Sequence, residues 1–221
     1  MIIVHHLNNS RSQRVLWLLE ELGLPYEIVH HQRDPKTMLA PDSLKAVHPL
    51  GKSPVIVDEG RTIAETGAII EYLVEKAGGM MRPIAGTPER LAWTYWLHYA
   101  EGSAMPPLLM KLVFGALPDR APGLIRPLVK GISAQALKSF VNPQLKSHFD
   151  YWESELNKTA WFAGPAFSAA DVMMSFPLEA ADQRGDVRNG RPRVSAFLDQ
   201  IHARPAYRTA LERGGPYDFA S

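Results

Sequence analysis

The sequence contains no cysteine among its 221 residues. Cysteine supplies disulfides, thiolate nucleophiles and the thiolate ligands of many zinc and iron–sulfur sites. Its absence excludes all three kinds of site and argues against a thiol–disulfide oxidoreductase. Any sulfur nucleophile that this protein uses must therefore arrive with a ligand.

Long apolar runs and an excess of charge are also missing. No apolar run approaches the roughly 20 residues of a transmembrane helix, and the start, MIIVHHLNNS, lacks the order of a signal peptide. Lys and Arg number 24 against 23 Asp and Glu, a net charge of +1, so nucleic acid and anionic membranes are not expected partners. Hydrophobic residues make up 46% of the chain, as in folded globular proteins. We expect a soluble, cytoplasmic protein.

The first 79 residues alternate strand and helix patterns. Residues 2–6 form an apolar, strand-like stretch, and VLWLLEEL places apolar side chains at helical spacing before a Gly-Leu-Pro turn. Residues 26–31 form a second strand pattern. Two strands joined through one helix predict a parallel βαβ unit. The next segment predicts a short helix near 43–47, a hairpin over 55–64 and a helix that ends at Gly78-Gly79.

From Thr87 onward only helical patterns occur. Met105-Pro106-Pro107 predicts a bend or break, and Pro127 and Pro143 divide the next long stretch into at least two helices. The segment FSAAD, residues 167–171, matches a capping box that starts a buried helix. We predict an α+β domain of order βαβ-α-ββα over 1–79, a linker over 80–87 and an all-α domain over 88–221.

Two short segments of the first domain are candidate docks for a ligand. Pro54 directly precedes a strand, and a cis bond after Ser53 would turn the peptide groups of Ser53 outward to pair with an extended peptide. Glu65-Thr66 directly precedes a helix, and Thr66 as its cap would leave the first N–H groups facing outward, where they suit a carboxylate. Glu65 is placed to pair with an ammonium on the same ligand, and Lys52 with a second carboxylate.

The pattern resembles the cytosolic glutathione S-transferase family. The thioredoxin-like half of that family is matched by SRSQRVLWLLEELGLPYEIV, HPLGKSPVIVDEG and ETGAIIEYL, in that order, and the helical half by WFAGPAFSAADVMMSFPL. The resemblance covers nearly the whole chain, and its SR-x-x-R start is similar to a serine-type branch from bacteria and fungi. It implies that the βαβ-α-ββα domain is thioredoxin-like and that glutathione is the co-substrate.

The resemblance also implies roles for particular residues. Ser53, with a cis Pro54, binds the cysteinyl main chain of glutathione in relatives of this kind. Glu65 and Thr66 match the acid–hydroxyl pair that binds the γ-glutamyl end, with Thr in place of the more usual Ser. Lys52 matches a lysine that can reach the glycine carboxylate. We therefore expect these five residues to form the glutathione-binding site.

The group that activates the thiol lies just after the first strand in relatives. Ser10 is the first choice, Asn9 the second and Ser12 a third. Ser10 with Gln13 also fits an S-x-x-Q capping box, in which the serine oxygen accepts the helix N–H and the hydroxyl proton stays free to point at a sulfur. Which of the three side chains contacts the sulfur is left open by the sequence.

The resemblance further implies an apolar electrophile site, a reaction and an assembly. Tyr99, Met105 and Leu109 of the helical half are candidate linings. The thiolate of glutathione would attack an electrophilic carbon or reduce an organic hydroperoxide, and the protein would form a homodimer. The alternative is a non-catalytic interaction module that has kept the scaffold.

The paired histidines His5-His6 and His30-His31 raise the question of a metal. Adjacent residues on a strand point to opposite faces, so neither pair can clamp one ion by itself. We therefore expect no metal site.

Overall fold

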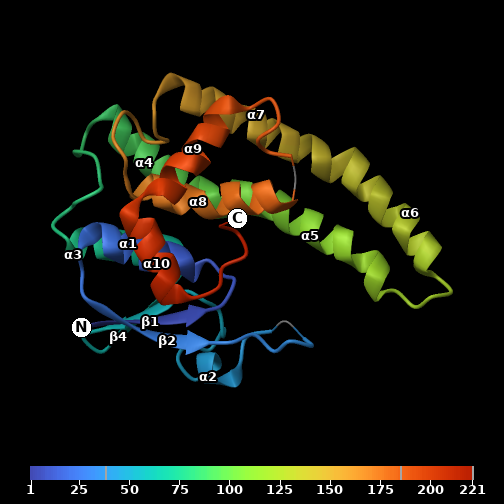
Figure 1. Cartoon of the computed structure of the whole chain (residues 1–221), viewed down its shortest axis with the longest axis horizontal. Helices are drawn as coiled ribbons and strands as arrows, with labels where there is room; N and C mark the ends of the chain where they lie inside the picture. Colours follow the sequence, from blue (N-terminus) through green and yellow to red (C-terminus); the bar gives the residue numbers. More distant parts are fainter. Residues whose placement is uncertain (38, 185, 221) are drawn as a thin grey trace.

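Four strands form one mixed sheet at one end of the molecule (Figure 1). The structure is a computed structural model that describes residues 1–37, 39–184 and 186–220. The sheet order is β2-β1-β3-β4, with β1 parallel to β2 and antiparallel to β3, and β3 antiparallel to β4. The strands are β1 (Ile2–Leu7), β2 (Tyr26–His31), β3 (Val55–Asp58) and β4 (Arg61–Ala64).

The predicted βαβ unit is confirmed. Helix α1 (Ser12–Leu22) connects β1 to β2, whose parallel register begins with Ile2 beside Tyr26. The side chains of α1 from Val15 to Leu19 are all fully buried, because this helix lies between the sheet and the helical domain. Gly23 ends α1 in the left-handed conformation.

The rest of the first domain also follows the predicted order. Short helix α2 (Asp42–Lys45) precedes the β3–β4 hairpin, in which Asp58 pairs with Arg61. Helix α3 (Thr66–Lys76) follows β4. One detail of the prediction is wrong: the cap of α3 is Glu65, at φ +71°, and Thr66 is the first helical residue.

The second half is helical throughout, apart from its connections. Two helices pass through a turn of π-helix, at η1 (Ala100–Ala104) and η2 (Leu137–Val141), and in each case a proline follows as the second residue after the turn. Proline lacks the N–H that a helix interior needs, and it stands here in the first turn of the next helix. The predicted interruptions are thus present as changes of helix type. The helices are α4 (Pro88–Tyr99), α5 (Met105–Arg120), α6 (Arg126–Ala136), α7 (Asn142–Lys158), α8 (Ala169–Arg184), α9 (Pro192–Ala203) and α10 (Pro205–Gly214).

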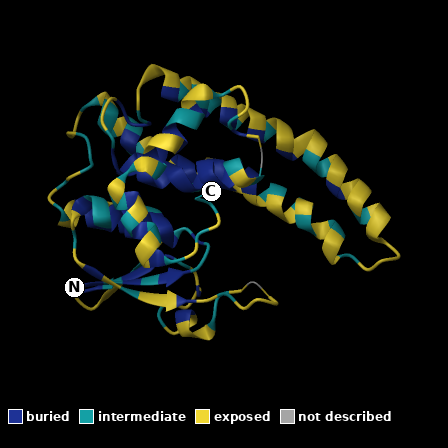
Figure 2. Cartoon of the chain, viewed as in Figure 1, coloured by how far each residue is buried: buried dark blue, intermediate teal, exposed yellow. Residues whose placement is uncertain are grey.

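Helix α8 forms the centre of the helical domain (Figure 2), and its residues 169–181 are all buried. The predicted capping box at its start is confirmed. The Asp171 carboxylate accepts the N–H of Ser168 at 2.8 Å, and Oγ of Ser168 accepts the N–H of Ala170 at 3.3 Å. Asp171 also accepts the N–H of Phe162 at 2.8 Å, so one side chain holds the helix start and the preceding loop.

The last helix returns to the first domain. Helix α10 packs on α1, and Arg213 donates to Glu20 at 2.7 Å. Arg204, just before α10, makes two bonds to Glu21 at 2.5 and 2.8 Å. The C-terminal segment is therefore held against the start of the chain.

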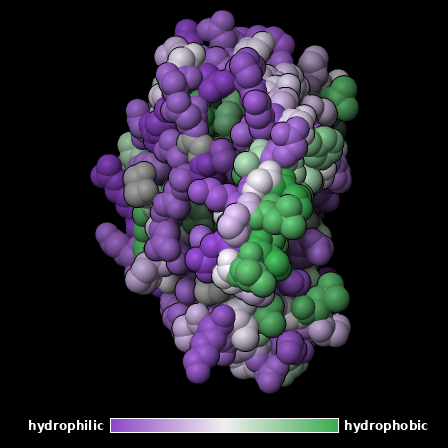
Figure 3. All heavy atoms as spheres, turned by 90° about the vertical axis from the view of Figure 1, so that its right-hand side faces the viewer, coloured by the Kyte–Doolittle hydropathy of each residue, from purple (hydrophilic) through white to green (hydrophobic). Residues whose placement is uncertain are grey.

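Helices α5 and α6 project from the body as an arm (Figure 1). Figure 3 faces this side of the molecule and shows apolar side chains gathered on it. In the described part of the chain, no helix is both long and apolar enough to span a membrane. The exposed large apolar side chains of the arm and its continuation into η2 are Leu109, Leu112, Val113, Leu117, Leu124, Ile125, Leu128, Ile132 and Phe140.

Candidate functional site

Ser10 lies in the turn between β1 and α1 and is 5% exposed. Its hydroxyl donates to the main-chain oxygen of Leu7 at 2.7 Å. The predicted S-x-x-Q capping box is wrong, because α1 is capped by Arg11 without a side-chain bond. Oγ of Ser10 instead accepts the N–H of Ser12 at 3.2 Å, and only the main-chain oxygen of Ser10 meets the N–H of Gln13. The hydroxyl proton is thus engaged in this state and must turn to reach a ligand.

Ser12 lies behind Ser10 and is fully buried. Its hydroxyl is 2.8 Å from Oγ of Ser10 and 2.9 Å from Nδ1 of His6. Burial, and secondarily the nearby His30, lower the pKa of His6 to about 4, so this ring is neutral near pH 7. The position of Ser12 does not support contact with a sulfur. Ser12 instead makes a hydrogen bond with the hydroxyl of Ser10 from the buried side of the turn.

Asn9 has a backbone φ of +49°, a conformation that Asn tolerates better than most residues. Its side chain is bound at both ends by one residue of the C-terminal segment. Nδ2 of Asn9 donates to Oδ2 of Asp218 at 2.7 Å, and Oδ1 accepts the N–H of Asp218 at 2.9 Å. Asp218 therefore occupies the amide oxygen and one of the two amide N–H groups of Asn9.

The predicted peptide dock has the expected geometry. The Ser53–Pro54 bond is cis. Oγ of Ser53 donates to the main-chain oxygen of His5 at 3.1 Å, which places the loop beside β1. Within the described ranges, the main-chain N–H and C=O of Ser53 make no hydrogen bond with the protein. These groups remain available to an extended ligand.

The predicted γ-glutamyl dock lies at the start of α3. Glu65 and Lys52 are exposed and form no ion pair with any described residue. Thr66 is buried, and Nη2 of Arg14 donates to its hydroxyl at 3.4 Å. Since α1 packs on α3, this bond ties the acid–hydroxyl pair to the helix that begins beside Ser10.

Two arginines of α1 and its cap share one acid from the helical domain. Nε of Arg11 lies 3.0 Å from both carboxylate oxygens of Glu101, and the guanidinium of Arg14 also contacts this carboxylate. Arg14 is 1% exposed and donates to the main-chain oxygen of Met173 at 2.7 Å. The network joins both domains next to Ser10.

Glu101 stays ionised at the centre of this network. Burial acts to raise its pKa, but Arg14 and Arg11 outweigh burial and hold the pKa below its ordinary value. Glu101 stands in η1, and single π-helical turns are frequent at functional sites. Nothing in the sequence pattern indicates that Arg11 and Glu101, 90 positions apart, will meet.

The three candidates for an electrophile site differ in position. Tyr99 is buried, and its hydroxyl contacts Nδ1 of His148 and accepts the indole N–H of Trp152 at 3.1 Å. That position in the helical core does not fit a role in lining a ligand site. Met105 is 5% exposed, whereas Leu109 is 52% exposed. Of the three, Leu109 offers the most surface.

The histidine pairs meet across β1 and β2. Nδ1 of His5 lies 3.1 Å from Nε2 of His31, and the rings of His6 and His30 are 5.8 Å apart. Burial comes first among the causes that lower the pKa of both His5 and His31. No group of three or more metal-ligating side chains is found among the described residues. The cross-strand pairing is a feature that adjacent spacing alone does not reveal.

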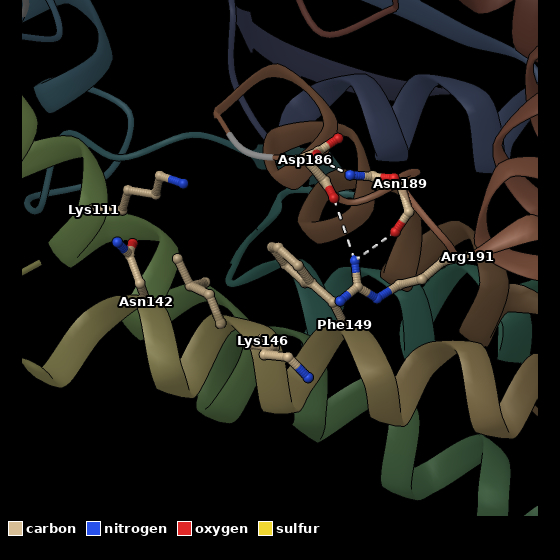
Figure 4. A pocket seen from close by; sticks show the side chains of 8 residues that line it. Lys111, Asn142, Lys146, Phe149, Asp186, Asn189 and Arg191 are labelled. Atoms are coloured by element: carbon tan, nitrogen blue, oxygen red, sulfur yellow. Dashed lines mark hydrogen bonds between the residues drawn. The ribbon is translucent and has the colours of Figure 1, made fainter. Parts of the chain in front are cut away.

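A cavity of about 330 Å³ lies away from α1, among α5, α7 and residues 186–191 (Figure 4). Its cations are largely neutralised: Arg191 donates to Asp150 at 2.7 Å and Lys146 donates to the same carboxylate at 2.5 Å. Arg191 also donates to the main-chain oxygens of Asp186 and Asn189. We assign this cavity no part in the site at α1.

The comparisons with known proteins agree with this geometry. The family model "Glutathione S-transferase, N-terminal domain" matches residues 10–76, and "Glutathione S-transferase, C-terminal domain" matches residues 135–200. Glutathione S-transferase 3 of Schizosaccharomyces pombe is 35% identical over 96% of this chain and 88% of its own length. Glutathione S-transferase 1 of Saccharomyces cerevisiae is 32% identical over 96% and 95%.

A solved structure gives the same result for the fold. The glutathione S-transferase of Actinobacillus pleuropneumoniae shares 30% identity and a TM-score of 0.80, over 100% of this chain and 96% of that one. Family models, curated relatives and fold together support one conclusion. The chain belongs to the glutathione S-transferase family.

Proposed function

We propose that this protein is a glutathione transferase in which Ser10 stabilises the thiolate of bound glutathione. The observation that carries the proposal is the set of unpaired groups around the end of β1. With respect to the residues that the structure describes, Ser53 offers a free main-chain N–H and C=O, and Glu65 and Lys52 offer unpaired charges. An extended peptide with an ammonium and two carboxylates matches all of them. Glutathione has this chemistry.

Each part of glutathione has a partner in the proposal. The main chain of its cysteine pairs with Ser53 beside the cis Pro54, and its γ-glutamyl end meets Glu65 and the start of α3. Glu65 holds a left-handed backbone conformation that is unfavourable for a residue with a side chain, and such conformations cluster at ligand sites. Lys52 receives the glycine carboxylate.

The free energy needed to activate the thiol can be compared with what one hydroxyl provides. A free thiol has a pKa of about 8.5, and lowering it by two units needs about 2.7 kcal/mol. A hydrogen bond to a charged group contributes about 1.5 to 3 kcal/mol and a helix N-terminus about 0.3 to 1 kcal/mol. One serine hydroxyl at the start of α1 therefore nearly suffices. The thiolate then attacks an electrophilic carbon, forms the carbon–sulfur bond and displaces the leaving group.

The surroundings of Ser10 favour it as the donor. Its oxygen accepts the N–H of Ser12 and lies within hydrogen-bond distance of the Ser12 hydroxyl. Donors on the oxygen strengthen the bond that the proton of the same hydroxyl makes to an anion. Turning that proton from the Leu7 carbonyl to a sulfur leaves Oγ of Ser12 within 3.3 Å of the carbonyl. Asn9 ranks second, because Asp218 occupies both ends of its amide.

The test is a titration of glutathione with wild type, Ser10→Ala and Asn9→Ala, following thiolate absorbance and conjugation of a generic electrophile. We expect Ser10→Ala to raise the pKa of the bound thiol and to lower kcat/KM roughly 10- to 100-fold. Ser133→Ala is the matched control, since Ser133 is a buried serine of α6. Full activity in Ser10→Ala overturns the residue assignment. A wild type that binds no glutathione overturns the enzyme and favours a non-catalytic module.

We also propose that two copies pair through the arm. Its exposed apolar side chains form a larger apolar surface than scattered single residues would. Burying such a face against a second copy removes it from water, which is the main driving force of stable homodimers. Light scattering of wild type and of Leu128→Glu with Ile132→Glu tests this. A dimer that persists in the double variant overturns the choice of surface.

A further inference from the structure

The C-terminal segment 217–220 lies across the start of α1. Asp218 holds both ends of the Asn9 side chain, at 2.7 and 2.9 Å, although the two residues are 209 positions apart. Asp218 is exposed, so these bonds form at the surface of the site rather than in the core.

Phe219, the next residue, places its aromatic ring between Phe176 and Arg184 of helix α8. The ring of Phe219 lies 5.1 Å from that of Phe176 in α8, and the guanidinium of Arg184 lies over it at 5.4 Å. The guanidinium groups of Arg11 and Arg14 also lie over the ring of Phe176, at 5.2 and 5.4 Å from its centroid. With the ring of Tyr217 5.4 Å from Phe219, the cluster holds three rings and three guanidinium groups.

The charge of this cluster is not balanced. Glu101 serves both Arg11 and Arg14, and no described acid forms an ion pair with Arg184. Burial, and secondarily the repulsion by Arg11, lower the pKa of Arg184. An added anion would relieve this repulsion.

We propose that Asp218 and Phe219 occupy a subsite for electrophiles that carry a flat aromatic ring and an acidic group. The ring of the ligand takes the place of Phe219 on Phe176, and its anion meets the guanidinium groups of Arg11 and Arg184 once Asp218 and Phe219 have moved away. The segment is a built-in competitor that such a ligand displaces. The inference rests on the proposed function, since it gives that site its class of second substrate.

The segment has a fixed end and a releasable end. The hydroxyl of Tyr217 donates to Glu179 at 2.7 Å, and Glu179 also receives Tyr207 and His202. Glu179 is 1% exposed, so this anchor belongs to the core. Asp218 is exposed and Phe219 half-buried. Displacement therefore needs to release only the residues after Tyr217.

The test measures binding of two fluorescent probes without any catalysis. Anilinonaphthalene sulfonate is flat and anionic, and N-phenylnaphthylamine has a similar ring system without charge. If the segment is closed in nine of ten molecules, the apparent Kd is about tenfold weaker than that of the open site. We expect Asp218→Ala with Phe219→Ala to bind the anionic probe about tenfold more tightly than wild type. A chain that ends at Tyr217 should behave in the same way.

Two further variants identify the site. Arg184→Gln in the double-variant background should weaken the anionic probe more than the neutral probe, because both lose the guanidinium over the ring and only the anionic probe also loses an opposite charge. Glu212→Gln, in the exposed part of α10, is the control and should change neither probe. Unchanged binding of the anionic probe in both the double variant and the shortened chain overturns the proposal. Circular dichroism checks that each variant is folded.

Competition with glutathione separates this inference from the proposed function. If reduced glutathione displaces the anionic probe, the cationic cluster serves a carboxylate of glutathione and the electrophile subsite is wrong. If both bind together, the subsite stands beside the glutathione site. Tight probe binding in a protein that binds no glutathione would contradict the transferase while leaving the displaceable segment intact.

Discussion

The turn before α1 and the turn before α8 both place a serine three residues ahead of a Gln or Asp side chain. Before α8, Asp171 accepts the N–H and the hydroxyl of Ser168, at 2.8 and 3.0 Å. Before α1, Ser10 donates to Leu7, and both amide atoms of Gln13 are buried without a hydrogen-bond partner. The same spacing therefore yields one closed capping box and one open polar turn.

The two turns differ in the hydrogen bonds that their side chains have to make. The turn at α8 is enclosed, and Asp171 must satisfy three donors, which include the N–H of Phe162. The turn at α1 lies at the edge of the proposed glutathione site, where a hydroxyl has to change its partner. A capping box would fix Ser10 on the helix. Leaving it open costs stability at Gln13 and keeps a movable donor, the kind of local conflict expected at functional sites.

The largest effect should come from breaking the closed box. Asp171→Ala leaves the N–H groups of Phe162 and Ser168 buried without acceptors, and each such group costs about 1 to 3 kcal/mol. We expect a loss of about 3 to 4 kcal/mol in the free energy of unfolding, measured by urea titration. Asp171→Asn should cost less, because burial already raises the pKa of Asp171 to about 7 and an amide keeps one acceptor. Equal losses for both variants would contradict this account.

Acid should weaken the open turn through His6. Its pKa is about 4 in the folded protein and about 6.5 when unfolded, so between these values the unfolded chain binds more protons. Stability is complete above pH 6.5 and falls as the pH drops toward 4, by about 2 kcal/mol at pH 5. His5 and His31 shift in the same direction. The slope of unfolding free energy against pH should flatten in His6→Gln; an unchanged slope would rule out His6 as its source.

The smallest effect, of opposite sign, should come from Gln13. Gln13→Met replaces an unsatisfied buried amide with an apolar side chain of similar length, so we expect a gain of about 1 kcal/mol. Its amide oxygen lies close to Gly214, and Met must fit the same space. Conjugation should be unaffected, since the variant leaves Ser10 in place. A loss of stability in thermal melts would show that the open turn uses the Gln13 amide.

Much of the fold was predictable because it depends on local pattern. The strands of the βαβ unit, the hairpin over 55–64 and the helix beginning after FSAAD are all present where the periodicity and turn residues indicate. The cis bond before Pro54 was also expected. The contacts of Arg11 and Arg14 with Glu101, and of Asn9 with Asp218, were not predictable, because they join residues 87 to 209 positions apart.

The sequence by itself indicated the family and the order of elements, and it supplied the residues that we propose to surround glutathione. These depend on short motifs whose geometry is set by neighbouring residues. Only the tertiary structure decided which serine turn closes as a capping box, that Tyr99 belongs to the core, and that Asp218 binds the side chain of Asn9. A hydroxyl takes whichever acceptor the packing brings within about 3 Å, and a linear pattern does not carry that distance.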